Sequence, residues 1–188
     1  MKIVLLASGA GSLAQAIFNA ISAGDLKCEI TSLISDQDSA VLQRAADASV
    51  STHFLPMLKD RAEWNRKLFD LVNSQSPDLV VSVGFMRILA PDFVSHFRVI
   101  NTHPALLPKY PGAHAVRDAL ADGATITGTT VHWVDAGVDT GAVIAQREIA
   151  INPEDDDDSL HERIKIQERL LIVETLKKFE SDGIPGAP

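Results

Sequence analysis

Short apolar runs alternate with helix-like segments through the first half of the chain, and this alternation restricts the possible folds most strongly. The runs IVLLA at 3–7 and LVVSV at 79–83 carry few polar residues, as do strands that are covered on both faces. Strands are predicted at 2–7, 28–35, 50–55 and 79–83, and helices at 11–23, 40–48 and 63–73. Alternation at this spacing indicates right-handed βαβ units. The sequence therefore predicts an α/β protein with an open, doubly wound, mostly parallel sheet.

The pattern changes from residue 98 onward. A short strand at 98–101 is followed by a proline-containing segment and then by a predicted helix at 113–121. The extended segments 125–134 and 142–151 are separated by only seven residues, too few for a helical crossover, so we expect an antiparallel hairpin that extends the sheet. The acidic run EDDDDS leads into the last helix, where Ser159 and Glu162 fit a capping box.

Domain organisation and cellular setting follow from length, linkers and composition. With 188 residues and no repeat or linker, the chain is predicted as a single domain, 1–188, with a flexible tail at 181–188. The single cysteine, Cys28, permits no intramolecular disulfide, which favours a reducing cytoplasm. No apolar run approaches the roughly 18 residues of a membrane span. The five-residue run IVLLA is also short for a signal peptide, so it is interpreted as a strand.

The charge balance excludes one class of partner. Lys and Arg number 17 against 25 Asp and Glu, a formal net charge of -8, whereas sequence-independent nucleic-acid binding needs a clustered cationic surface. A small anionic ligand remains possible, because a few local donors can hold a phosphate. His and Cys residues do not occur at zinc-ligand spacing, and the acidic run reads as a solvated helix entry, so we expect no metal site.

The first candidate site is the glycine loop SGAGSLAQAI at 8–17. Glycines between a strand and a helix leave backbone N–H groups free at a positive helix terminus, which favours an anion such as phosphate. The pattern Gly9-x-Gly11-x-x-Ala14 also approaches the dinucleotide-binding fingerprint, with Asp36 where a ribose-binding acid would lie. A tight turn that requires small residues for packing explains the same letters, so three interpretations remain open.

The second candidate is INTHPALLPKYPG at 100–112, in which Asn101 ends a predicted strand and His103 lies just past it. Ligands of open parallel sheets bind beyond the carboxyl ends of strands. An amide N–H can donate to a developing oxyanion, and an imidazole exchanges protons near neutral pH. The prolines restrict the loop that follows. A polar loop with a histidine bonded to backbone is the alternative on spacing alone.

The third candidate is Asp139 in the segment VDAGVDTG, between the two strands of the hairpin. A carboxylate there could orient a histidine, raise its pKa or relay a proton. Ordinary turn chemistry accounts for the same residue when it is considered alone. His132 alternates with apolar positions in the neighbouring strand and receives no role from the sequence.

Four longer segments give the chain a resemblance to a known family. GFMRILAP (84–91), INTHPALLPKYPGAH (100–114), GTTVHWVDAGVDTG (128–141) and HERIKIQE (161–168) closely resemble the folate-dependent formyltransferases that act on glycinamide ribonucleotide. The likeness spans nearly the whole chain. It implies a Rossmann-like fold, 10-formyltetrahydrofolate as the formyl-donating cosubstrate, no metal, and a monomer or homodimer without nucleic-acid or membrane partners. It also implies that 1–97 binds the phosphate and ribonucleotide, and that 98–180 carries catalysis and folate binding.

The resemblance also implies roles for individual positions. The family's catalytic residues fall on Asn101, His103 and Asp139. The ribonucleotide-binding positions fall on Gly11, Ser12, Leu13, Gly84, Lys165 and Glu168. The folate-binding positions fall on Arg61, Met86, Arg87, Ile88, Leu89, Asn101, Ala136, Gly137, Val138 and Asp139. The family commonly has an asparagine where this chain has Leu13, so phosphate binding here would depend on the backbone amide.

The reaction expected from the resemblance is direct attack of the substrate amine on the formyl carbon. Asn101 and a protonated His103 would stabilise the oxyanion, and Asp139 would favour the imidazolium and take part in a proton relay with an ordered water. A sugar formyltransferase is the nearest alternative. A methionyl-tRNA formyltransferase or a formyltetrahydrofolate hydrolase would carry a further domain. A nicotinamide-dependent oxidoreductase, or a non-catalytic binding module, would rest on the glycine loop and Asp36.

Overall fold

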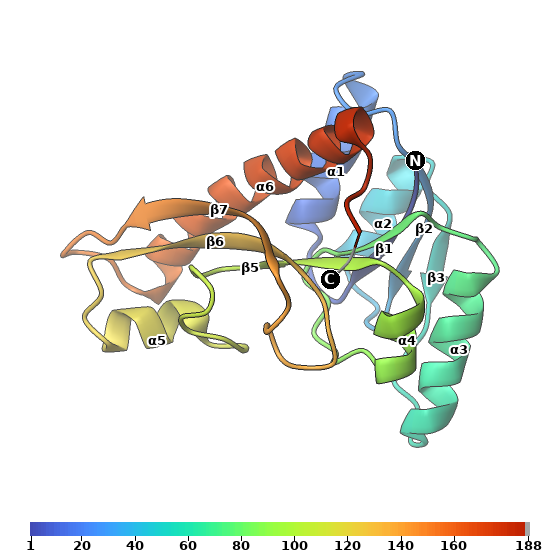
Figure 1. Ribbon diagram of the computed structural model, residues 1–188, viewed down its shortest axis with the longest axis horizontal. Helices are drawn as coiled ribbons and strands as arrows, with labels where there is room; N and C mark the ends of the chain where they lie inside the picture. Colours follow the sequence, from blue (N-terminus) through green and yellow to red (C-terminus); the bar gives the residue numbers. More distant parts are fainter. Residues whose placement is uncertain (187–188) are drawn as a thin grey trace.

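The computed structural model describes residues 1–186. Their strands form a single seven-stranded sheet (Figure 1). Its order is β3-β2-β1-β4-β5-β6-β7, in which β1 to β5 are parallel and β6 and β7 are antiparallel. The strands are β1 (Lys2–Ala7), β2 (Glu29–Ser35), β3 (Thr52–Phe54), β4 (Leu79–Ser82), β5 (Val99–His103), β6 (Ile126–Trp133) and β7 (Val143–Ala150). This arrangement confirms the predicted α/β class, the mostly parallel sheet and the antiparallel hairpin.

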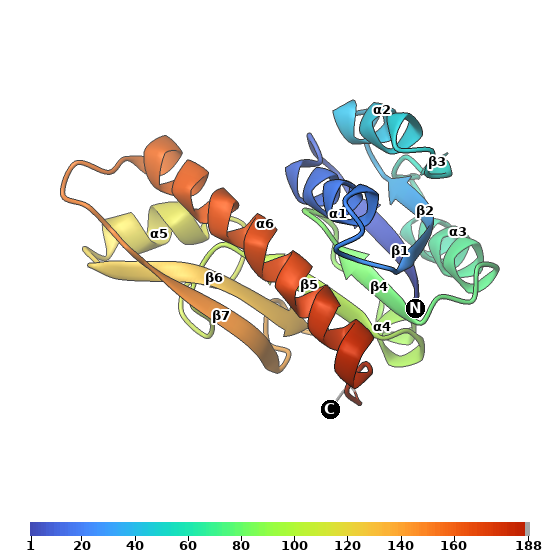
Figure 2. The same cartoon turned by 90° about the horizontal axis from the view of Figure 1, so that it is seen from above.

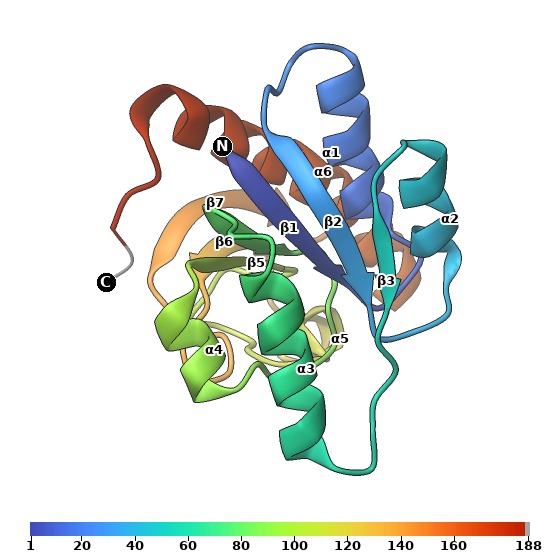
Figure 3. The same ribbon diagram turned by 90° about the vertical axis from the view of Figure 1, so that its right-hand side faces the viewer.

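The helices cover both faces of the sheet, as Figure 3 shows. They are α1 (Ser12–Ser22), α2 (Ala40–Asp47), α3 (Arg61–Asn73), α4 (Pro91–His96), α5 (Ala115–Ala121) and α6 (Asp157–Asp182). Alternate residues of β1 separate the two layers: Leu5 packs with residues of α1, α2 and α6, whereas Leu6 packs with residues of α3 and α4. The long helix α6 crosses the β5–β7 half of the sheet (Figure 2). At the carboxyl ends of the parallel strands the chain continues into loops.

Several helix starts differ from the sequence expectation, and three of them have a local explanation. Helix α3 begins at Arg61 because the Asp60 side chain accepts a hydrogen bond from the Ala62 N–H at 2.9 Å. Helix α4 was not predicted, because six residues that begin with a proline carry no helical period. At α6 the capping box joins Asp156 to Ser159, not Ser159 to Glu162. The aspartate one turn earlier supplies the acceptor.

Gly11 is required both by its backbone and by its neighbour. Its φ of 81° lies in the left-handed region, and a Cβ at this position would come within 2.3 Å of Val41 Cγ2. We expect Gly11→Ala to lower the free energy of unfolding by about 2 kcal/mol or more, since strain and overpacking each cost on the order of 1–3 kcal/mol. Denaturant unfolding measures this loss. Gly9→Ala is the control, because a Cβ there meets nothing within 4 Å; equal stability of the two variants would contradict the packing argument.

Candidate active site

Strand β5 places two of the predicted residues on one face of the sheet. The strand continues through His103, two residues beyond the expected end, so Asn101 and His103 are alternate residues of the same strand. Asn101 pairs with His132 of β6, and His103 pairs with Thr130. Ile100, which precedes Asn101 and points to the opposite face, belongs to the core cluster that includes residues of α6. Asn101, His103 and His132 therefore share the face opposite α6.

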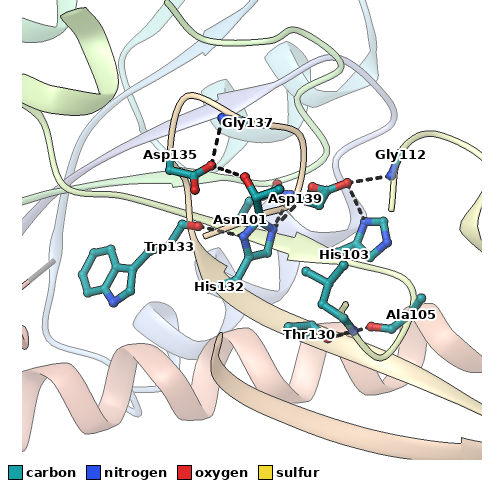
Figure 4. A network of polar contacts seen from close by, with 12 residues as sticks. Asn101, His103, Ala105, Gly112, Thr130, His132, Trp133, Asp135, Gly137 and Asp139 are labelled. Atoms are coloured by element: carbon teal, nitrogen blue, oxygen red, sulfur yellow. Dashed lines mark hydrogen bonds and ion pairs between the residues drawn. The ribbon is translucent and has the colours of Figure 1, made fainter. Parts of the chain in front are cut away.

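The loop between β6 and β7 brings Asp139 onto this face, as Figure 4 shows. Its Oδ2 lies 3.4 Å from Nδ1 of His103, and its Oδ1 lies 3.5 Å from Nε2 of His132. The Gly112 N–H donates to Oδ2 at 2.8 Å. Asp139 thus connects the strand β5 histidine, the strand β6 histidine and the proline-containing loop. Sequence reasoning had not established that Asp139 reaches His103, and the structure places them in contact.

Local bonds fix the shape of the 135–141 loop. Asp135 Oδ1 accepts hydrogen bonds from the Gly137 N–H at 3.0 Å and from the Thr140 hydroxyl at 2.7 Å. A Cβ on Gly141 would lie 1.8 Å from the Trp133 carbonyl oxygen, so only glycine fits there. Asp139 itself has φ 55°, a conformation that Asp and Asn adopt more readily than most residues. The loop therefore holds the carboxylate in a defined position.

Backbone carbonyls determine which nitrogen of each histidine carries the proton. Nε2 of His103 lies 2.7 Å from the Tyr110 carbonyl oxygen, which can only accept, so Nε2 donates and Nδ1 is the open acceptor of the neutral ring. In His132, Nδ1 donates to the Trp133 carbonyl at 2.8 Å. Nε2 of the neutral His132 ring can then accept from the Asn101 amide at 3.3 Å. The second amide N–H of Asn101 remains available.

His132 is the site residue that sequence reasoning missed. Alternation with apolar residues shows only that one face of β6 differs from the other. The register of β6 against β5, which pairs His132 with Asn101, is the signal that would have included it. That register depends on hairpin geometry, which periodicity alone does not determine.

Burial controls the charge of His103 in the free protein. Its side chain is 4% exposed, and desolvation lowers its pKa from the ordinary 6.5, although Asp139 and the Tyr110 carbonyl act in the opposite direction. The charge of Asp139 thus favours the imidazolium, as the sequence led us to expect, but burial has the larger effect. For Asp139, burial opposes ionisation, but the adjacent His132 ring and the hydrogen bond from the Gly112 N–H keep its pKa below the ordinary value. The buried His103 ring, with its lowered pKa, therefore lies beside a carboxyl group whose pKa is also lowered.

The glycine loop leads from β1 into α1. Gly11 is the N-cap of α1, and no side chain caps this terminus, so the first backbone N–H groups of the helix face outward. The Leu13 side chain is buried in the core. At this terminus the Leu13 side chain is therefore not available to a ligand, whereas the Leu13 amide and Ser12 can be.

Lys165 and Glu168 lie three residues apart on α6, but they do not form a pair. Lys165 Nζ bonds Glu162 Oε1 at 2.8 Å. Glu168 is only 6% exposed, and burial raises its pKa to about 7. Helix α6 packs against α1, and its residues in the shared core cluster include Leu171 and Ile172. Glu168 can thus exist as either acid or carboxylate near neutral pH.

The 84–89 segment, which follows β4, presents apolar side chains outward. Met86 is 70% exposed and Ile88 is 64% exposed, whereas Leu89 is buried in the core beside α3 and α4. Arg61 donates to the Ile88 carbonyl and lies over the Trp64 ring at 4.6 Å. Val138, in the loop that carries Asp139, is also exposed. Exposed apolar side chains at the open edge of a sheet are suited to a flat aromatic ligand.

Two searches of the described residues bear on other classes of site. Within 1–186, His, Cys, Asp and Glu side chains form no group of three or more that could hold a metal ion. Across the same residues, every helix is too short or too polar to span a bilayer.

Comparison with known families identifies the chain. Residues 1–176 match the formyl transferase family. The chain belongs to this family. Among curated relatives, the phosphoribosylglycinamide formyltransferases of Mycobacterium tuberculosis and Escherichia coli K12 are 44% and 40% identical to it. Both alignments cover 97% of this chain, together with 86% of the M. tuberculosis protein and 88% of the E. coli protein.

Solved structures of similar proteins share the fold of this chain over nearly its whole length. Glycinamide ribonucleotide transformylase 1 from Symbiobacterium toebii superposes with a TM-score of 0.93 at 32% identity, covering 100% of this chain and 92% of that one. The phosphoribosylglycinamide formyltransferase of Coxiella burnetii, solved with CHES, gives 0.91 at 38% identity, with 97% and 88% covered.

Proposed function

We propose that the chain transfers the formyl group of 10-formyltetrahydrofolate to the amine of glycinamide ribonucleotide. The products are formylglycinamide ribonucleotide and tetrahydrofolate, as required in purine biosynthesis. The observation that carries the proposal is the network of Asn101, His103, His132 and Asp139 at the open edge of a formyl transferase sheet. Relatives with 44% and 40% identity carry the corresponding name.

The ribonucleotide is assigned to the glycine loop and α6. The uncapped start of α1 at Gly11, Ser12 and Leu13 would hold the phosphate through backbone N–H groups. Gly84, whose φ is 80°, lies beside this loop, and it has no side chain that would block a ligand. Lys165 and Glu168 would complete the site from α6, where a carboxylate can accept from ribose hydroxyls.

The folate donor is assigned to the space between the 84–89 segment and the 135–141 loop. Its ring would contact the exposed side chains of Met86 and Ile88 from one side, and the segment Ala136–Asp139 from the other. Arg61 would face the anionic part of the donor. The site draws on both 1–97 and 98–180, because Arg61 and the glycine loop come from one half and the catalytic residues from the other.

The reaction begins with attack of the neutral amine on the formyl carbon. A C–N bond forms, the carbonyl oxygen becomes an oxyanion, and the free N–H of Asn101 donates to it. The amine loses a proton to Nδ1 of His103, and the resulting imidazolium lies beside the Asp139 carboxylate. The bond from carbon to N10 then breaks, and N10 receives the proton through this relay. The negative carboxylate thus stabilises a charge that appears only during reaction.

The lowered pKa of His103 predicts the pH dependence. If Nδ1 must accept a proton, kcat/KM should fall on the acid side with an apparent pKa below 6.5, because burial lowers the pKa of His103. Folding stability should fall in the same range, since the unfolded chain takes up the proton at higher pH than the folded chain. An NMR titration of the His103 ring measures the pKa directly. A value above 6.5 in the free protein would contradict this account.

The activity is tested by absorbance change with purified protein, 10-formyltetrahydrofolate and glycinamide ribonucleotide. Turnover that requires both compounds supports the proposal. A nucleotide sugar that replaces the ribonucleotide as the acceptor would support the sugar formyltransferase alternative. Stabilisation by NAD(H) in a thermal-shift assay without formyl transfer would support the oxidoreductase. No turnover and no stabilisation by either cofactor would indicate a binding module of another kind.

A further inference from the structure

The carboxylate of Asp36 is buried between three loops at the open edge of the sheet. Asp36 follows β2 directly, and its side chain is fully shielded from solvent. Its oxygens accept from the Ser8 hydroxyl at 2.5 Å, from Arg87 Nε at 2.6 Å and from Gln37 Nε2 at 3.2 Å. An acid with every partner already in place is not free to bind a ribose diol. The structure thus removes the feature on which dinucleotide binding depended.

These bonds join the glycine loop to the 84–89 segment. Ser8 donates its hydroxyl proton to Asp36 and accepts from the Met86 N–H at 2.9 Å, while the Ser8 N–H donates to the Gly84 carbonyl at 3.1 Å. Arg87, the middle residue of the segment, extends its guanidinium to Asp36. The segment is therefore attached to the β1 and β2 ends at Gly84, Met86 and Arg87.

A second attachment holds the other end of the segment. Arg61 of α3 donates to the Ile88 carbonyl. Arg61 and Arg87 lie close enough that burial and the neighbouring Arg87 charge lower the pKa of Arg61. Asp36 is the carboxylate that neutralises this side of the segment. Without it, Arg87 would lose its carboxylate partner while its positive charge still acted on Arg61.

We propose that Asp36 is a positioning residue that, through Arg87 and Ser8, holds the 84–89 segment in the shape that receives the folate donor. The inference rests on the proposed function and concerns how its donor site is built. Asp36 touches no reacting atom in this account. Its hydrogen bonds with Ser8 and Arg87 would hold the segment so that the exposed side chains of Met86 and Ile88 can both contact a flat ring.

Asp36→Asn tests the proposal, because asparagine keeps an acceptor for Ser8 and removes the charge that Arg87 requires. We expect the KM for 10-formyltetrahydrofolate to rise about tenfold or more, in line with losing a charged hydrogen bond in a buried pair. We expect kcat and the KM for glycinamide ribonucleotide to change less than about threefold, because the effect acts on donor binding alone.

Glu174→Gln is the matched control. It breaks an Arg147–Glu174 pair of the same 2.6 Å length between β7 and α6, away from the segment. This control should leave the donor KM unchanged. Arg87→Met removes the other partner and should give the same donor effect, and the double variant with Asp36→Asn should cost much less than the product of the two single changes. If Asp36→Asn does not fold, Arg87→Met carries the measurement.

The two levels of inference fail differently. A wild-type protein that lacks formyl transfer overturns the proposed function. A wild-type protein that transfers formyl, with Asp36→Asn and Arg87→Met variants of unchanged donor KM, overturns the positioning role alone. A fall in kcat together with equal rises in both KM values would also contradict the positioning role, because that result would indicate a general structural defect.

Discussion

Replacing Asn101 with alanine should lower kcat about 10²- to 10³-fold, the usual cost of losing one oxyanion donor. His132 accepts one amide N–H of Asn101 at 3.3 Å and so orients the other toward the reacting oxygen. Alanine removes the donor without changing the backbone of β5. The measurement is steady-state turnover with both substrates saturating. Retained thermal stability would show that the loss lies in the chemical step.

Asn152→Ala serves as the control for this experiment, since Asn152 is exposed in the loop after β7. It should leave kcat unchanged. Near-wild-type turnover in folded Asn101→Ala protein would contradict the oxyanion assignment. Backbone N–H groups near the site would then be the alternative oxyanion donors.

Asp139→Asn should lower kcat roughly 10²-fold or more, within the range of a lost proton-transfer partner. Asparagine tolerates the left-handed backbone at this position, so the loop should keep its shape. The charge that stabilises the His103 imidazolium disappears, and the pKa of His103 should fall further below 6.5. Turnover and an NMR titration of His103 report the two effects separately.

Asp118→Asn on the exposed surface of α5 is the control for Asp139→Asn. It removes a carboxylate without touching the network. An Asp139→Asn variant with wild-type turnover would exclude the carboxylate from the relay. An unchanged His103 pKa in that variant would show that the 3.4 Å contact carries little electrostatic energy.

Much of the fold could be predicted because the central strands β1 and β4 are buried on both faces. The runs at β1 and β4 contain almost no polar residues, and the spacing between strands permits only βαβ connections. Helix α4 was not predicted because it has only six residues and begins with a proline. The start of α6 was misplaced because two overlapping patterns, Asp156 with Ser159 and Ser159 with Glu162, fit the same letters.

The candidate site was predicted only in part, for reasons of register and burial. Asn101, His103 and Asp139 could be selected because polar residues at strand ends and turns are recognisable in sequence. The inclusion of His132 depends on how β6 pairs with β5, which the sequence does not determine. The lowered pKa of His103 could not be predicted, because sequence shows the neighbouring carboxylate but not the desolvation that outweighs it.

Asp36 shows how one sequence signal can belong to two structures. An acid at the end of the second strand of a βαβ unit indicates ribose binding when its side chain is free. Here Arg87, 51 residues further along the chain, occupies it at 2.6 Å. No local pattern around Asp36 reveals that partner.

The most direct test of the central claim follows the formyl carbon itself. The purified protein is incubated with glycinamide ribonucleotide and 10-formyltetrahydrofolate labelled with ¹³C at the formyl carbon, and the product is observed by NMR. The account predicts a labelled formamide carbon attached to the ribonucleotide, formed only when enzyme and both substrates are present, and strongly reduced with Asn101→Ala. Label that remains on the folate, or that appears only as free formate, would contradict it.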